Sequence, residues 1–223
     1  MTRKGRITAV LLTLALSRPA LAAMAARPPA DPLSEARLIE AALNGLTGLV
    51  ADFTQTVESA ALPKPQVETG TMFLLRPGRM RFEYEQPPGK VAIADSRKTW
   101  LYLPEEHRVL VAPIDAQGAG GMSLLLQEKV DIAATFVVTW AGEGGSEAPA
   151  PRLKLTPRSA DAGYQYLMVE SDAEHLIRAL AVVDPLGSTV TYRFSRLRRT
   201  SQFPEAMFRF TAPRGVEVQE LRP

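Results

Sequence analysis

The stretch from Thr69 to Pro88 constrains the fold more than any other segment of the chain. Its first arm, residues 67–76, alternates with a period of two and carries apolar side chains on both registers, which is typical of a strand covered on both faces. A Pro-Gly pair interrupts the pattern, and residues 79–85 then alternate apolar with charged side chains. This hairpin predicts a curved antiparallel sheet with one surface packed by the protein and another facing an apolar partner.

An amphipathic helix is predicted before this hairpin. Asp31 supplies its N-cap and Pro32 its first-turn proline. Apolar residues then recur at helical spacing, at Leu33, Ala36, Leu43, Leu46 and Val50. A short, very apolar helix is expected at residues 122–127.

The many short strand patterns indicate a mainly β (α+β) fold class, a single wrapped antiparallel sheet or open barrel. Strands are predicted at residues 51–59, 67–76, 79–85, 91–94, 99–103, 108–112, 135–140, 152–157, 164–170, 176–184 and 188–197.

The N-terminus has the pattern of a secretory signal peptide at residues 1–22. A basic start precedes an apolar run, residues 7–16, that is too short to span a bilayer, and Ala20-Leu21-Ala22 matches a cleavage site. An uncleaved anchor is the alternative, and cleavage near Ala25 or Ala26 is also compatible with the sequence. A flexible lead-in is expected at residues 23–31, and one domain at residues 32–223.

Charge and cysteine content restrict the possible partners and compartment. Of the 26 basic residues, four lie in the predicted signal peptide, so 22 remain against 24 acidic residues and nucleic acid is not expected as a partner. The chain has no cysteine, which excludes disulfides, thiolate chemistry and lipid attachment to cysteine. A soluble exported protein of a bacterial periplasm is the expected class.

Catalytic patterns are nearly missing from the sequence. His107 and His175 are the only histidines, each is predicted to lie in a solvated turn, and no spaced cluster indicates a metal site. No cofactor is therefore expected. A lipid-hydrolysing enzyme is the least favoured hypothesis, because its nucleophile and base would have to be a pair such as Ser123 and His107.

Several motifs in order resemble the LolA family of periplasmic lipoprotein carriers. They are residues 51–55 (ADFTQ), 76–84 (RPGRMRFEY), 100–104 (WLYLP), the apolar run 122–126, and residues 208–216 (FRFTAPRGV). The resemblance covers essentially the whole mature chain. It implies an incomplete barrel of antiparallel strands, closed by a lid of helices over an apolar cavity.

The resemblance also implies a function and partners. Members receive triacylated lipoproteins from an inner-membrane ABC-type release complex, shield the acyl chains, and pass them to an outer-membrane acceptor where one is present. The protein is then a carrier and not an enzyme, and a monomer is expected. The alternative is a periplasmic sensor domain that detects lipids or lipoproteins on the same fold.

By motif position, Arg76 corresponds to the family's arginine that holds the lid through hydrogen bonds to its backbone; a simple cap of the hairpin is the alternative. An ordinary packed core is the alternative for the apolar residues assigned to the cavity and lid. We assign Phe53, Met72, Met80, Phe82, Tyr84, Trp100 and Tyr102 to the acyl-chain cavity, and Met122, Leu124 and Leu125 to the lid.

Overall fold

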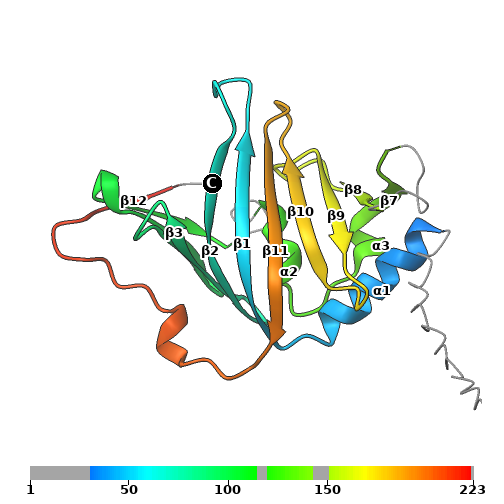
Figure 1. Ribbon diagram of the computed structural model, residues 1–223, viewed down its shortest axis with the longest axis horizontal. Coiled ribbons are helices and arrows are strands. Elements are labelled where there is room, and N and C mark those ends of the chain that lie inside the picture. Colours follow the sequence, from blue (N-terminus) through cyan, green and yellow to red (C-terminus); the bar gives the residue numbers. More distant parts are fainter. Residues whose placement is uncertain (1–30, 115–119, 143–150, 222–223) are drawn as a thin grey trace, which may run out of the picture.

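The computed structural model describes residues 31–114, 120–142 and 151–221. The predicted signal peptide and nearly all of the lead-in lie outside these residues. The described residues form one curved, unclosed sheet of twelve strands (Figure 1) in the order β12-β6-β5-β4-β3-β2-β1-β11-β10-β9-β8-β7. The strands are β1 (Gly48–Glu58), β2 (Gln66–Leu75), β3 (Arg79–Gln86), β4 (Val91–Asp95), β5 (Lys98–Leu103), β6 (Arg108–Pro113), β7 (Phe136–Trp140), β8 (Leu153–Pro157), β9 (Tyr166–Ser171), β10 (Ile177–Val183), β11 (Thr189–Arg199) and β12 (Glu217–Glu220).

The predicted open antiparallel sheet is confirmed, with one addition. The eleven predicted strands match β1 to β11, and β1 joins the two halves of the sheet by pairing with both β2 and β11. The additional strand, β12, pairs in parallel with β6, with Glu217 opposite Arg108. This pairing could not be predicted from local patterns, because the four residues of β12 carry no apolar alternation and their partner strand lies about a hundred positions earlier.

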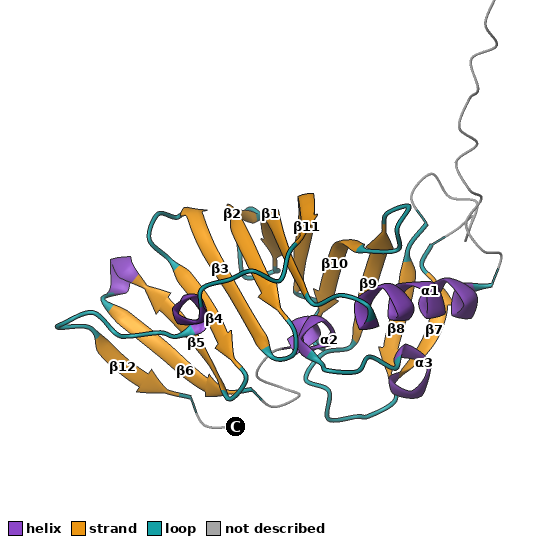
Figure 2. Ribbon diagram, turned by 90° about the horizontal axis from the view of Figure 1, so that it is seen from below, coloured by secondary structure: helices purple, strands orange, loops and turns teal. Residues whose placement is uncertain are grey.

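Three α-helices lie over one face of the sheet (Figure 2): α1 (Pro32–Asn44), α2 (Ser123–Leu126) and α3 (Ile132–Thr135). The N-cap of α1 is the predicted one, since the carboxylate of Asp31 accepts hydrogen bonds from the backbone of Leu33 and Ser34. The helix buries Ala36, Ile39 and Leu43 against the sheet, in the same core cluster as residues of β1 and β2. In Figure 2, α1 and α3 cover the half of the sheet that contains β7–β10, while α2 lies near the middle of the sheet.

Two details of the predicted elements are wrong. Val50 belongs to β1 and not to the apolar face of the helix, because α1 ends at Asn44 and the chain turns at Gly45. Gly48 follows this turn and begins β1. A Cβ atom at Gly48 would lie 2.2 Å from the carbonyl oxygen of Thr200, so the close approach of β1 and Thr200 requires glycine. The start of β2 is also not covered on both faces, since Val67 is 59% exposed.

The second face of β2–β5 is covered by the C-terminal segment, residues 200–216, which runs along the outside of the sheet (Figure 1). Phe203 packs edge-to-face against Phe73 and Phe208, and the side chain of Phe208 is fully buried. Arg81 donates to the carbonyl oxygen of Met207 at 3.1 Å. This segment explains why β2 carries apolar side chains on both registers.

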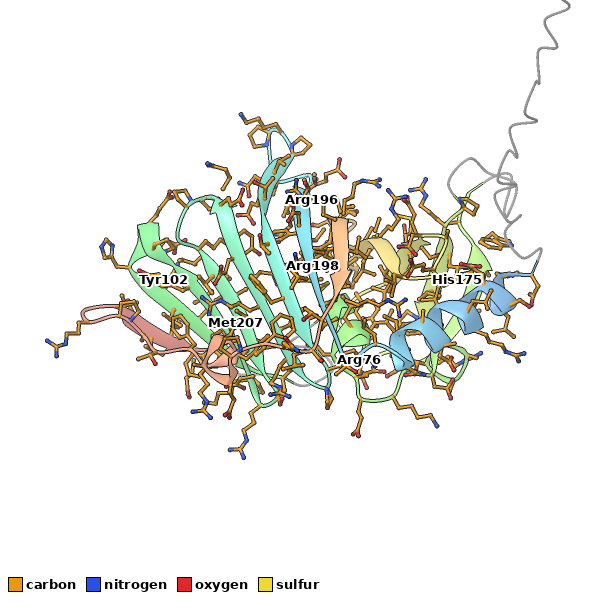
Figure 3. The ribbon with its side chains drawn as sticks, turned by 60° about the horizontal axis from the view of Figure 1, so that its bottom comes forward. Arg76, Tyr102, His175, Arg196, Arg198 and Met207 are labelled. Carbon is orange, nitrogen blue, oxygen red and sulfur yellow. The ribbon has the colours of Figure 1, made fainter. Side chains whose placement is uncertain are left out.

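A buried carboxylate fastens α1 to the far half of the sheet. Glu35 accepts a hydrogen bond from the Ser171 hydroxyl at 2.7 Å, and Nδ1 of His175 lies 3.2 Å from the same oxygen. His175, labelled in Figure 3, is therefore not a simple solvated turn residue. Within the described residues, no helix has the length and apolarity needed to cross a membrane.

Candidate functional site

A cavity of about 360 Å³ lies between the concave face of β3–β6 and the lid. Its wall is built by alternation: successive inward residues of β3 pair across the sheet with inward residues of β4, such as Met80 with Ala94 and Phe82 with Ala92. The wall is mostly apolar, as a site for hydrocarbon requires. The inward side chains include Met80, Phe82, Tyr84, Ala92, Ala94, Leu101 and Leu110.

Phe53 and Met72 support this wall without lining the cavity. The Phe53 ring packs edge-to-face against Phe82 and Tyr84, with ring centres 4.9 and 5.0 Å apart. The Phe53 ring fits there because Gly70 lies directly opposite it, where a Cβ atom would come within 2.9 Å of the ring. Met72 lines a second, much smaller hollow together with Leu125.

The lid begins at a 3₁₀ turn, η2 (Gly120–Met122), and continues as α2. Met122 and Leu126 face the cavity, while Leu125 points toward the second hollow and Leu124 is buried. The sequence-based list of lid residues therefore lacked Leu126, the last leucine of the same apolar run. At the base of the lid, Gly121 lies so close to the sheet that a Cβ atom would meet Leu167 and Val182 at 2.5 Å.

Arg76 ties the end of the lid to the sheet. Two nitrogens of its guanidinium donate to the carbonyl oxygen of Gln127: Nε, at 3.2 Å, and one terminal nitrogen. The same terminal nitrogen also donates to the carbonyl oxygen of Glu128 at 3.4 Å. The side chain is only 7% exposed, and this burial lowers the pKa of Arg76 from its ordinary value. Figure 3 shows Arg76 at the edge of the sheet, between the lid and the end of α1.

Further contacts hold the segment that follows the lid. The backbone N–H of Gly78 donates to Leu126 O at 2.8 Å. Asn44, the last residue of α1, bonds both the carbonyl and the N–H of Val130, and Glu40 accepts from the N–H of Ile132. These contacts satisfy several backbone polar groups between residues 126 and 132, so hydrogen bonds as well as apolar packing hold this segment against the sheet and α1.

The assignment of Tyr102 to the cavity is wrong, and that of Trp100 needs revision. Both residues alternate with Leu101, which lines the cavity, so their rings lie on the other face of β5. There Phe210 stacks on Trp100 at 5.7 Å and lies 6.1 Å from Tyr102. Trp100 borders the cavity, but its ring packs under the C-terminal segment.

One end of the cavity is polar. The Tyr84 hydroxyl donates to Gln55 Oε1 at 2.9 Å, and Lys90 lines the cavity while bonding both carboxylate oxygens of Glu68 at 2.7 Å. Burial, together with the negative charge of Glu68, raises the pKa of Tyr84 and raises the pKa of Tyr192 to about 12. Sequence reasoning missed Gln55, Lys90 and Tyr192, because no local pattern brings these distant residues together.

Within the described residues, no three histidine or acidic side chains converge as metal ligands. His107 directly precedes β6, whereas Ser123 is the first residue of α2. A nucleophile and its base need hydrogen-bond distance, and no hydrogen bond is found between these two side chains within the described residues.

Residues 44–211 match the family described as outer membrane lipoprotein carrier protein LolA. The chain is a member of the LolA family. It is 32% identical over 170 residues to an outer-membrane lipoprotein carrier protein of Dechloromonas aromatica (strain RCB), covering 76% of this chain and 80% of that protein. A protein of the same description from Neisseria gonorrhoeae (strain ATCC 700825 / FA 1090) is 30% identical over 175 residues, 78% of this chain and 82% of its own.

The LolA-family fold also has a counterpart among solved structures. A DUF1329 family protein from Desulfovibrio piger superposes with a TM-score of 0.50 at 14% identity, covering 80% of this chain and 98% of the other. Identity this low shows a shared fold and nothing about the ligand.

Proposed function

We propose that this LolA-family protein is a periplasmic carrier that shields the acyl chains of lipoproteins between the inner and outer membranes. The observation that carries the proposal is the apolar cavity under a hydrogen-bonded lid, in a chain that belongs to a family of lipoprotein carriers. Family membership favours this carrier role over the lipid-sensing alternative and over an enzyme.

The energetics of acyl chains demand a container of this kind. Removing each methylene from water gains about 0.8 kcal/mol, so several long chains released into water would be prohibitively costly. The wall of the cavity offers aromatic rings, a methionine and small alanines, which adapt to flexible chains better than a single rigid shape.

The present cavity is too small for such a cargo. At about 360 Å³, it lies near the lower end of the roughly 300–1,000 Å³ range of sites that hold one drug-sized molecule. The acyl chains of a triacylated lipoprotein require more room than that. We therefore infer that loading requires η2 and α2 to move away from the sheet.

Arg76 gives the closed state its stability in this scheme. Its hydrogen bonds to Gln127 and Glu128 exist only when the lid is down, so they oppose loading and favour release. Met80, Phe82 and Tyr84 would contact the cargo from the sheet, and Met122 and Leu126 from the lid. The carrier thereby keeps its cargo without binding it permanently.

The partners follow from the same scheme. An inner-membrane ABC-type release complex would load the protein, and an outer-membrane acceptor, where present, would unload it. Residues 1–22 would direct export as a cleaved signal peptide.

The decisive experiment uses the mature protein and membrane vesicles that contain the release complex and a labelled lipoprotein. After addition of ATP, the carrier proposal expects the label to leave the vesicles in a soluble one-to-one complex. Label that stays in the vesicles, while a separate fluorescent lipid probe still binds the cavity, would overturn the carrier proposal and favour the sensor.

A further inference from the structure

We propose that the polar end of the cavity, built by Gln55, Tyr192 and Lys90, binds the neutral carbonyl oxygens of acyl esters or amides and so sets the direction in which an acyl chain lies. This inference rests on the proposed carrier function and identifies the part of the cargo that the site recognises.

The cavity changes from apolar to polar along β3. Met80 lies beside Gly78, which bonds the lid, while Tyr84 lies four residues further along the strand, or roughly 13 Å away. Phe82 lies between them. An amphipathic ligand therefore has one favourable orientation, with its hydrocarbon under the lid and its polar group beside Tyr84.

Hydrogen-bond donors are available at this end. Gln55 is 8% exposed and lines the cavity, and its amide oxygen is occupied by the Tyr84 hydroxyl. In the part of the chain that the structure describes, neither the Gln55 amide nitrogen nor the Tyr192 hydroxyl has a hydrogen-bond partner. Gln55 and Tyr192 face each other across β1 and β11. Both residues line the cavity, so a ligand that supplies an acceptor can form hydrogen bonds with these donors there.

Lys90 adds a further donor but no net charge. Its ammonium carries three hydrogens, and both of its bonds go to the one carboxylate of Glu68. It also lies 4.4 Å from the centre of the Tyr84 ring. The Lys90–Glu68 pair, exposed by only 12% and 17%, is neutral as a unit.

Electrostatics select the kind of acceptor. Burial and the charge of Glu68 raise the pKa of Tyr84 and of Tyr192, which means that additional negative charge is unfavourable at this end. A fatty-acid carboxylate would bring such a charge, whereas an ester or amide carbonyl accepts the same hydrogen bonds without it. The site therefore suits acylated glycerol and acylated amines better than free fatty acids.

The test compares three ligands with the same sixteen-carbon chain: 1-monopalmitoylglycerol, its ether analogue 1-O-hexadecylglycerol, and palmitate. The ester and the ether differ only at the carbonyl. Affinities are measured at pH 8 by displacement of a fluorescent acyl probe from the mature protein. We expect the ester to bind roughly fivefold more tightly than the ether, the gain of one or two hydrogen bonds, and more tightly than palmitate.

Variants locate the effect within the cavity. Tyr192→Phe and Gln55→Leu are expected to lose the ester preference and to bind ester and ether equally. The matched control is Thr99→Val, which alters a cavity residue whose hydroxyl already donates to Ala112 O and should keep the ester preference. If Gln55→Leu does not fold, the more conservative Tyr192→Phe carries the test.

The outcomes separate this inference from the carrier proposal. Equal binding of ester and ether by the wild-type protein, or tightest binding of palmitate, would overturn the inference and leave the carrier intact. An ester preference that persists in Tyr192→Phe and Gln55→Leu would also overturn it. Failure of every ligand to displace the probe would contradict the apolar container itself, and with it both proposals.

Discussion

Arg76 holds the main-chain carbonyl of Gln127 with two of its nitrogens, so a single side chain at the end of β2 fixes the residue that directly follows α2. The guanidinium is buried and has no carboxylate partner within salt-bridge distance among the described residues. A buried cation satisfied by backbone carbonyls alone depends on those carbonyls staying in place. The contact is thus sensitive to any movement of the lid.

Replacing Arg76 by leucine should trap cargo. Arg76→Leu removes hydrogen bonds that exist only in the closed state, and bonds to charged groups contribute about 1.5–3 kcal/mol each. We expect normal loading but at least tenfold slower transfer of a labelled lipoprotein to acceptor membranes. The control Arg178→Leu makes the same chemical change at an exposed position of β10 and should transfer normally. Wild-type transfer by Arg76→Leu would contradict the latch.

Asn44→Ala should loosen the segment behind the lid. The Asn44 amide makes two hydrogen bonds to Val130, at 2.8 and 2.9 Å, so its loss frees both backbone groups. Hydrogen exchange of the Val130 amide should accelerate about tenfold, which corresponds to roughly 1.4 kcal/mol. Ser34→Ala, in the first turn of α1, should leave this amide unaffected; equal acceleration in both variants would mean that α1 as a whole has been destabilised.

The C-terminal segment should contribute strongly to stability. Phe208 is 2% exposed, and truncation of a buried phenylalanine costs about 3–5 kcal/mol. Urea unfolding of Phe208→Ala should show a loss of this size. Leu186→Ala, at a turn residue that is 91% exposed, should change the free energy of unfolding by less than about 0.5 kcal/mol. A small loss for Phe208→Ala would show that the segment is not firmly packed on the sheet.

Alkaline pH should destabilise the protein through its cavity tyrosines. The pKa of Tyr192 is raised from 10.0 to about 12 by burial, so the folded state retains a proton that the unfolded chain releases. The associated stability is fully present below pH 10 and is lost as the pH rises toward 12. Tyr192→Phe should reduce this loss by up to about 2–3 kcal/mol, since each pKa unit corresponds to about 1.4 kcal/mol.

Leu186→Ala is the control for that experiment, because it alters a turn residue that is 91% exposed and carries no ionisable group. It should unfold with the wild-type dependence on pH. An identical pH profile for Tyr192→Phe and wild type would mean that the Tyr192 hydroxyl is not protected in the folded state.

Local patterns predicted most of the fold and part of the site. Alternation in Met80, Phe82 and Tyr84 correctly predicted one apolar register of β3, and the N-cap at Asp31 marked the start of α1. Alternation cannot say which face of a strand is concave. Trp100 and Tyr102 therefore looked like cavity residues, although they pack beneath Phe210. Only the path of the C-terminal segment decides between the two faces.

The polar end of the cavity was beyond sequence reasoning for a different reason. Gln55, Lys90 and Tyr192 come from β1, from the turn after β3, and from β11, and each alone resembles an ordinary surface residue. Their shared environment arises from strand order, with Gln55 paired to Glu68 on one side and to Tyr192 on the other. Such a cluster can be found only after the register of the sheet is known.

Strand β12 has a consequence for how two copies of this protein can meet at the edge of the sheet. A long sheet that ended at β6 would offer neighbouring molecules a row of unpaired backbone groups, a template for fibre growth. Four exposed residues occupy that edge instead, with a glutamate at each end, one of them paired to Lys98. A short, charged edge strand is a poor template for a neighbouring sheet, so β12 disfavours edge-to-edge association at this end of the sheet.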